Sequence, residues 1–366
     1  MPFFISCATY NRKMSKYYSQ IEAGNYQKAS NNLSSNKFIQ SDRNRLLFYL
    51  EKGKVHHLMQ NYDSSNLYFN LADKYWEDHF RNTADISKSL LINPMTTKYL
   101  GESFEPFMMH YYKALNYVSL GKTDGALVEA RRISLSSNRL SDKVTNKSKY
   151  QKDAFALNLQ GILYEIDNDY NNAFIAYRNA IDIYLANNGN YYGTTTPIQL
   201  QNDLLRTARY MRFEDQISKY QKLFNIKDTI RIQPKNEAII FIEQGFAPQK
   251  KEVNFNLARG FGGANIFTYI DSDGNGVNVP FNAGNYQNAG INDNNLTGIR
   301  SIRVALPIYA LRYQSPMPIS VKINNNTFQT EQIENINTIA VSGLKERYPS
   351  EIANAIARQL VKIAIE

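Results

Sequence analysis

The chain has 366 residues, of which 43% are hydrophobic and 20% are charged, so it is long enough for two domains and too apolar for wholesale disorder. Its net charge of +9 comes from scattered Lys and Arg residues, which favours a solvated basic surface and predicts no nucleic-acid partner. A single cysteine excludes an internal disulfide, and without a run of 18 apolar residues no transmembrane helix is predicted.

The one cysteine, Cys7, follows a short apolar stretch at the start of the chain. Phe3-Phe4-Ile5-Ser6-Cys7 looks like the end of a bacterial lipoprotein signal, in which a small residue precedes the lipidated cysteine. Phe4 stands where leucine is usual, no basic region comes first, and the apolar run is short. We expect residues 1–12 to be a signal remnant and tether, with Cys7 carrying acyl chains. An ordinary cysteine behind an apolar lead is the alternative.

Residues 13–228 show apolar positions three and four apart, broken by short turns, which predicts a row of helical hairpins. Small and aromatic residues recur there at the spacing of a tetratricopeptide repeat (TPR), most clearly at Gly161, Tyr164, Ala173, Tyr177 and Ala180. The spacing recurs at Ala114, Tyr117, Ala126, Ala130 and Ile133, less completely at Gly53, His56, Ser65, Phe69 and Ala72, and in part at Tyr17, Gln20, Ala29 and Leu33. Because small residues let antiparallel helices approach closely, we predict an irregular TPR-like array.

The first helices of such an array line a concave face that usually binds peptides. The repeat register places an apolar and aromatic stripe there, with few charges: Leu47, Leu50, Lys54, His57, Met108, Tyr111, Leu115, Phe155, Asn158, Ile162 and Glu165. We call these residues the predicted groove. Two interpretations carry equal weight: a groove for a partner peptide, or a surface that packs under another part of the same chain.

After about residue 229 the pattern becomes β-rich. The stretches TIRI, EAIIFIEQG, EVNFNL, IRSIRVALPIYAL and PISVKIN resemble strands, and Gly/Asn-rich loops separate them. Residues 229–330 therefore predict a small β-rich domain with long loops. Residues 331–366 return to a helical pattern, with an amphipathic helix starting directly after Pro349. The expected fold class is α+β: a TPR-like helical domain, a smaller β-rich domain and a C-terminal helix.

Three short motifs resemble ligand-binding loops, and each has a simpler interpretation. GKTDG at 121–125 lacks the first glycine of a phosphate loop and falls at a helical turn. GFGGAN at 260–265 has Asn265 where a dinucleotide fingerprint needs glycine. DSDGNGVNVPFN at 271–282 matches the front of a calcium loop but ends in Asn282 rather than glutamate, so weak Ca²⁺ binding and an exposed hairpin loop both stay open. We predict no cofactor and no metal site.

Charged and imidazole side chains in the helical region favour structural roles. His56 falls in the aromatic slot of its repeat, which favours core packing. Glu129 and Arg132 are three residues apart on a predicted helix, which favours a solvated face with one ion pair between them over a ligand-facing basic patch.

Several segments together resemble a family of bacterial TPR-containing lipoproteins of poorly defined role. They are CATYNRKMSKYYSQIEAGNYQKA, LLFYLEKGKVHHLMQNYDSS, HYYKALNYVSLGKTDGALVEARR, FIEQGFAPQKKE and RVALPIY, which span nearly the whole chain. In that family the chain typically continues past a helix like the one that ends at Glu366. Family genes often neighbour those of small lipoproteins resembling activators of penicillin-binding proteins. The resemblance implies a lipid-anchored protein of the bacterial cell envelope, with the outer membrane as the expected location.

These observations predict a non-enzymatic, lipid-anchored envelope scaffold that binds a protein or peptide through the predicted groove and the membrane through lipid on Cys7. One alternative is an envelope enzyme or enzyme subunit that acts on cell-wall glycan or lipid, with Asp271 and Asp273 as its carboxylates. Glycosidase carboxylates need a defined separation across a cleft, which a turn does not provide. A second alternative is a soluble TPR adaptor, which only the fate of Cys7 distinguishes from the scaffold.

Overall fold

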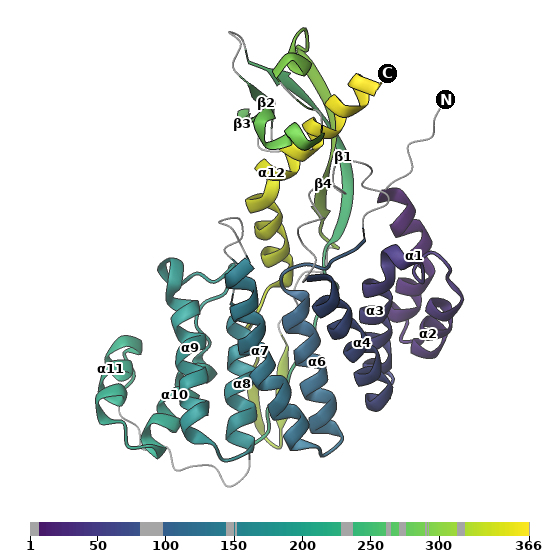
Figure 1. Cartoon of the computed structure of the whole chain (residues 1–366). Coiled ribbons are helices and arrows are strands. Elements are labelled where there is room, and N and C mark those ends of the chain that lie inside the picture. Colours follow the sequence, from purple (N-terminus) through teal and green to yellow (C-terminus); the bar gives the residue numbers. More distant parts are fainter. Residues whose placement is uncertain are drawn as a thin grey trace.

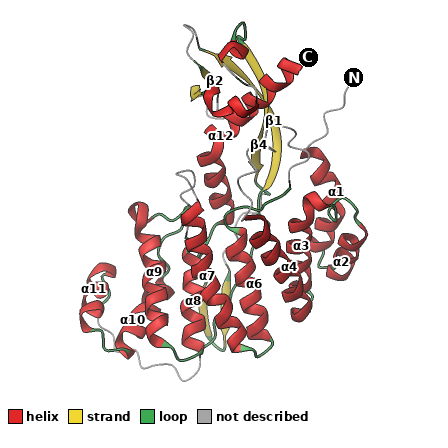
Figure 2. Ribbon diagram, viewed as in Figure 1, coloured by secondary structure: helices red, strands yellow, loops and turns green. Residues whose placement is uncertain are grey.

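The computed structural model describes residues 7–80, 98–143, 150, 152–227, 237–260, 265–270, 276–289, 291, 293–312 and 319–365. A row of helices is followed by a small antiparallel sheet and a long C-terminal helix (Figures 1 and 2). The predicted α+β fold class is therefore confirmed at this level.

The helical part is a succession of antiparallel helices that lie side by side in Figure 1. The first and second helices of each hairpin alternate along the chain. They are α1 (Cys7–Glu22), α2 (Tyr26–Ser35), α3 (Arg45–Leu58), α4 (Tyr62–Phe80), α6 (Glu105–Ser119), α7 (Thr123–Lys143), α8 (Ala154–Ile166), α9 (Tyr170–Gly189), α10 (Ile198–Tyr210) and α11 (Glu214–Phe224). A one-turn 3₁₀ helix, η1 (Asp42–Asn44), precedes α3.

One turn geometry closes every hairpin of the described helices. Two residues after the end of each first helix the backbone is left-handed, at Gly24, Gln60, Gly121, Asn168 and Arg212. In each turn the next amide donates to the carbonyl five residues back, as Lys122 does to Tyr117 and Asp169 does to Tyr164, both at 2.9 Å. This is the Schellman motif, which satisfies the last carbonyls of a helix. The prediction that GKTDG forms a turn between two helices is confirmed.

Glycines allow the helices of two hairpins to touch. Gly53 of α3 lies against the ring of Phe69 in α4, and Gly161 of α8 lies against the ring of Tyr177 in α9. A Cβ atom built on either glycine would lie 2.5 Å or 2.3 Å from the facing ring. Both pairs are sixteen residues apart in sequence (69 − 53 and 177 − 161), as the predicted spacing requires.

The sheet has the strand order β3-β2-β1-β4, and every neighbouring pair is antiparallel. Its strands are β1 (Gln249–Arg259), β2 (Ile266–Ile270), β3 (Gly276–Pro280) and β4 (Ser301–Ala310). The sequence indicated β1 and β4. It did not indicate β2, which lies between two predicted loops, and β3 lies in a stretch that it assigned to a loop. Phe267, Tyr269 and Val279 supply their buried side chains, too few for a visible pattern among the surrounding Gly and Asn residues.

The chain from 229 to 330 is not confined to that sheet. The stretch EAIIFIEQG is extended but pairs with no strand within the described residues, and it lies on the helices instead. A separate hairpin forms from β5 (Ser320–Ile323) and β6 (Asn326–Gln329), whose side chains are mostly exposed. TIRI lies outside the described residues.

Helix α12 (Ile336–Ile365) joins the two parts of the molecule, as Figure 1 shows. Ile339 and Ala340 belong to the core of the helical array, whereas Ile352, Ile356 and Leu360 pack under the sheet. The sequence predicted a helix that starts after Pro349, but the helix runs through this proline. Burial at both ends offsets the one backbone hydrogen bond that proline cannot make.

A single carboxylate ties the helical array to the sheet and to α12. Glu102, just before α6, accepts from Lys250 of β1 and, at 2.7 Å, from Arg347 of α12. Burial works to raise the pKa of Glu102, but Lys250 and Arg347 outweigh it and hold the pKa below its ordinary value. The carboxylate is therefore charged in the folded protein, and it fixes the sheet relative to the helices.

A buried charge network joins α4, α6 and α7. Glu129 accepts from His110 Nδ1 at 2.7 Å and from Lys113 Nζ at 2.9 Å, while Arg132 pairs with Asp73. The predicted Glu129–Arg132 pair is therefore wrong. The two side chains diverge because Glu129 turns into the helix interface, where it is almost fully buried, whereas Arg132 reaches α4.

Candidate functional site

The predicted groove residues lie on α3, α6 and α8, and we call the surface that these three helices form the first-helix face. Tyr111, Phe155, Asn158 and Ile162 are buried there, and the other seven residues are partly buried. Leu47 packs with the separate core of α1 and α2, whereas Leu50, Met108 and Leu115 pack against the main helical core. Because all eleven predicted groove residues are at least partly buried, another part of the molecule must cover the first-helix face.

The occupant is the chain's own residues 237–247, which we call the crossing segment. Phe241 lies between two aromatic rings of the predicted groove, with ring centroids 6.0 Å from Tyr111 and 5.9 Å from Phe155. Ile239 joins Phe241 in packing against the helical core. The stripe that the sequence offered to a partner thus holds an extended peptide of the same molecule.

Basic side chains hold both acidic residues of the crossing segment. Glu243 accepts from Lys54 Nζ at 2.5 Å and from the Tyr112 hydroxyl at 2.9 Å. Glu237 accepts from Arg206 of α10 at 3.2 Å. Burial works to raise the pKa of Glu243, but the charge of Lys54 outweighs it and holds the pKa below its ordinary value. Glu243 is therefore held as a carboxylate.

The crossing segment spans the array from α10 to α1. Beyond Glu243, the Phe246 ring lies 6.2 Å from the ring of Tyr18 in α1. The Arg312 guanidinium stacks near both rings, 4.1 Å from the Tyr18 centroid and 5.3 Å from the Phe246 centroid. Each described first helix thus either contacts the crossing segment or belongs to the core on which the crossing segment packs.

The crossing segment alternates between an inward and an outward face, as an extended chain does. Glu237, Ile239, Phe241 and Glu243 face the helices, whereas Ile240 is 52% exposed and Ile242 is 39% exposed. Within the described part of the chain, the backbone of residues 237–243 makes no hydrogen bond. Among the described residues, side chains therefore hold positions 237–243 in place.

Three other polar residues of the predicted groove differ in their hydrogen bonding: His57 and Glu165 have partners in the helices, whereas the Asn158 oxygen has none among the described residues. His57 Nδ1 lies 2.7 Å from Asn116 Oδ1, and its ring tilts against Tyr112 with centroids 5.0 Å apart. Glu165 accepts from the Tyr177 hydroxyl and from Arg206, each at 2.6 Å. Asn158 Oδ1 is buried and has no hydrogen-bond partner among the described residues.

Sequence reasoning missed two side chains that grip the crossing segment. Tyr112 is next to Tyr111 in sequence, but the repeat register placed only Tyr111 on the first-helix face. Arg206 lies in the α10–α11 hairpin, where no repeat was found. The second helix of this hairpin, α11, carries Ile217 at the position where the other second helices carry a small residue: Ala29, Ser65, Ala126 and Ala173. Because that small residue is missing, the spacing of the repeat could not be recognised there.

A buried carboxyl pair lies beside the first-helix face. Asp153 caps α8 by accepting from the Ala156 amide at 2.7 Å, and Glu334, in the segment between β6 and α12, hydrogen-bonds to Asp153. Burial raises the pKa of Glu334 well above its ordinary value, and repulsion from Asp153 adds to the effect. Burial raises the pKa of Asp153 as well, so the two neighbouring carboxyls together favour keeping a proton.

The raised pKa of Glu334 predicts that the free energy of unfolding falls as the pH rises. A raised folded-state pKa gives stability that is complete below the unfolded pKa of about 4.3 and is lost as the pH rises through the folded pKa. Glu334→Gln keeps an N–H donor for Asp153 and cannot ionise. We expect the variant to have the larger free energy of unfolding at pH 8 and to lose less between pH 5 and pH 8. Urea titrations at the two pH values measure both free energies. If the free energy of unfolding changes by the same amount between pH 5 and pH 8 in both proteins, the prediction is wrong.

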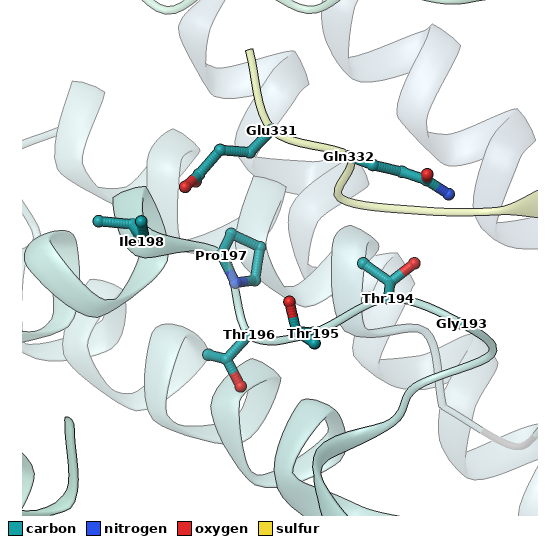
Figure 3. Close-up of a pocket in the computed structure, with 8 residues that line it drawn as sticks. All are labelled: Gly193, Thr194, Thr195, Thr196, Pro197, Ile198, Glu331 and Gln332. Carbon is teal, nitrogen blue, oxygen red and sulfur yellow. The ribbon is translucent and has the colours of Figure 1, made fainter. Parts of the chain in front are cut away.

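A pocket of about 290 Å³ lies where the α9–α10 loop meets the segment after β6 (Figure 3). It is lined by residues 193–198, Glu331 and Gln332, and the Glu331 carboxylate accepts from the Gln199 amide at 3.2 Å. None of the predicted groove residues lines it. Glu331 already occupies one backbone amide at the start of α10, and no other observation points to a ligand, so we assign the pocket none.

The remaining motifs give no further site. Asp271 and Asp273, the carboxylates of the alternative enzyme, lie outside the described residues, as do 261–264 of GFGGAN. No described group of three or more His, Cys, Asp or Glu side chains is placed to hold a metal ion. No helix among the described residues is long and apolar enough to span a bilayer. Cys7 is the first residue of α1.

Comparison with known proteins identifies no family. No family model matches the chain, and no curated protein matches it. Among solved structures the chain is similar to the crystal structure of BtubC (BKLC) from P. vanneervenii, with 15% sequence identity and a TM-score of 0.39. The similarity covers 65% of this chain and 88% of that chain.

Proposed function

We propose that this protein is a non-enzymatic scaffold whose TPR-like helical array binds an extended peptide of another protein on its first-helix face. The observation that carries the proposal is the crossing segment, an extended peptide that this face holds through Lys54, Arg206, Tyr111 and Phe155. A face with matched basic and aromatic side chains for one such peptide has the chemistry to hold another.

The TPR-like assignment rests on two regularities. The described hairpins share one Schellman turn, and the small-on-aromatic pairs Gly53–Phe69 and Gly161–Tyr177 have the same separation. Stacked hairpins of this kind form extended surfaces that suit peptide binding. Unequal spacing between the hairpins makes the array irregular.

The proposal includes an envelope location with lipid on Cys7. The lipoprotein-like sequence before Cys7 and the resemblance to envelope lipoproteins support it. Acyl chains on the first residue of α1 would tether the array at its N-terminal end, and two or more chains give stable membrane attachment. If Cys7 carries no lipid, the same array is a soluble adaptor.

Charge reversal on the first-helix face tests the function. We expect Lys54→Glu/Arg206→Glu to lose most of the partner that the wild type captures after crosslinking in cells, because both acidic anchors of a bound peptide meet like charges. The control, Lys122→Glu/Lys219→Glu, makes the same change in net charge at exposed positions. Equal capture by all three proteins removes the proposal. In the same experiment, Cys7→Ser is expected to leave the membrane fraction; membrane retention excludes the lipid anchor.

A further inference from the structure

We propose that the crossing segment is a built-in competitor, which fills the first-helix face in the free protein and yields to a partner peptide of the same alternating chemistry. The inference rests on the proposed function, because it specifies the partner and the state of the face before binding. The partner carries an acidic, an aliphatic, an aromatic and a second acidic side chain at every second position, as Glu237, Ile239, Phe241 and Glu243 do.

The spacing of the fixed groups on the helices sets this motif. Arg206 and Lys54 grip carboxylates six residues apart, a span of about 20 Å in an extended chain. Between them, Tyr111 and Phe155 take one aromatic ring. A helical peptide of six residues spans only about 9 Å, so it cannot reach both basic side chains. The face therefore selects an extended ligand.

The crossing segment fills the face incompletely, which makes it displaceable. Its backbone from 237 to 243 makes no hydrogen bond within the described part of the chain, and Ile240 and Ile242 stay exposed. Asn158, on α8 one turn from Phe155, is buried with its amide oxygen unpaired among the described residues. A buried acceptor without a donor is costly. A partner whose backbone or side chain donates to Asn158 gains an interaction that the crossing segment does not make.

Tethering gives the crossing segment an advantage that a partner must overcome. A segment attached to the same chain acts at an effective concentration in the millimolar range. A free peptide of equal intrinsic affinity therefore binds only to the small fraction of molecules in which the face is open. Removing the inward side chains of the crossing segment raises that fraction and leaves the face itself unchanged.

A labelled peptide measures the competition directly. The probe is a fluorescein-labelled peptide with the sequence of residues 236–247, NEAIIFIEQGFA, and the readout is fluorescence anisotropy. All proteins are the full chain with Cys7→Ser. We expect Phe241→Ala/Glu243→Ala to bind the peptide at least about tenfold more tightly than the parent. Glu243→Gln, which removes only a charge, shifts affinity in the same direction and serves if the double variant fails to fold. Adding Lys54→Glu abolishes the gain.

The control changes the outward side of the same segment. Ile240→Ala/Ile242→Ala keeps the inward anchors and is expected to bind the peptide as weakly as the parent does. The competitor proposal is wrong if a folded variant without the inward anchors binds the peptide no more tightly than the parent does. If charge reversal at Lys54 and Arg206 still abolishes partner capture in that case, the scaffold function stands alone. If capture is also unchanged, both proposals fail.

Discussion

Replacing Glu129 by leucine is expected to lower the free energy of unfolding by about 3–5 kcal/mol, because it leaves a buried ammonium without its closest counter-ion. The Lys113 side chain is only 1% exposed, and its nearest remaining carboxylate is Asp73 at 3.5 Å. Burial works to raise the pKa of Glu129, but His110 and Lys113 hold it below its ordinary value, so Glu129 is charged. Urea denaturation at pH 7 measures the loss.

The double variant Glu129→Leu/Lys113→Met separates the lost charge pair from a change in packing. Replacing both members of a buried ion pair by apolar side chains of similar volume is often neutral or stabilising. We therefore expect the double variant to recover most of the stability that Glu129→Leu loses, with a coupling energy that a double-mutant cycle measures. A single variant that costs less than about 1 kcal/mol would show that Lys113 finds water or another partner.

Gly161→Ala is expected to destabilise the protein by about 1–3 kcal/mol, although alanine is the better helix former. The new Cβ would lie 2.3 Å from the Tyr177 ring, so helices α8 and α9 would have to separate. The ring cannot swing aside, because Tyr177 is fully buried and its hydroxyl donates to Glu165 at 2.6 Å. Thermal unfolding followed by circular dichroism measures the effect.

Gly343→Ala is the matched control for that substitution. Gly343 also lies inside a helix, α12, but a Cβ atom there meets nothing within 4 Å. We expect a gain of about 0.5–1 kcal/mol, the ordinary preference for alanine in a helix. If the two variants changed stability alike, close packing at Gly161 would not be the reason for its glycine.

The helical part was predictable mainly because apolar residues recur at helical spacing along it. Gly24, Gly121 and Asn168 add turn residues suited to a left-handed backbone, and Gly53 and Gly161 add small residues opposite rings. Strands β2 and β3 were not predictable, because five-residue strands between Gly and Asn carry only two or three inward side chains each. Pro349 misled the prediction for α12, since the sequence alone does not show that burial at both helix ends outweighs one missing hydrogen bond.

The candidate site was half predictable. The register identified Lys54, Tyr111 and Phe155, which do meet at one surface. The pattern of EAIIFIEQG predicted a strand, and the segment is extended but pairs with no strand among the described residues. Nothing local shows that its inward face meets helices rather than a neighbouring strand. That outcome depends on the distance between Lys54 and Arg206, which only the assembled array fixes.

The position of α12 after the other described helices and strands determines when the two cores can be completed during synthesis. A chain emerges from the ribosome with its N-terminus first, at about 5–20 residues per second. Ile339 completes the core of the array and Ile356 completes the core of the sheet, yet both belong to the element that follows all the others. Neither core is therefore complete until α12 has been made. Until residues 237–247 have been made, the first-helix face lacks the segment that covers it, and a partner peptide of the kind proposed above would meet no competitor there.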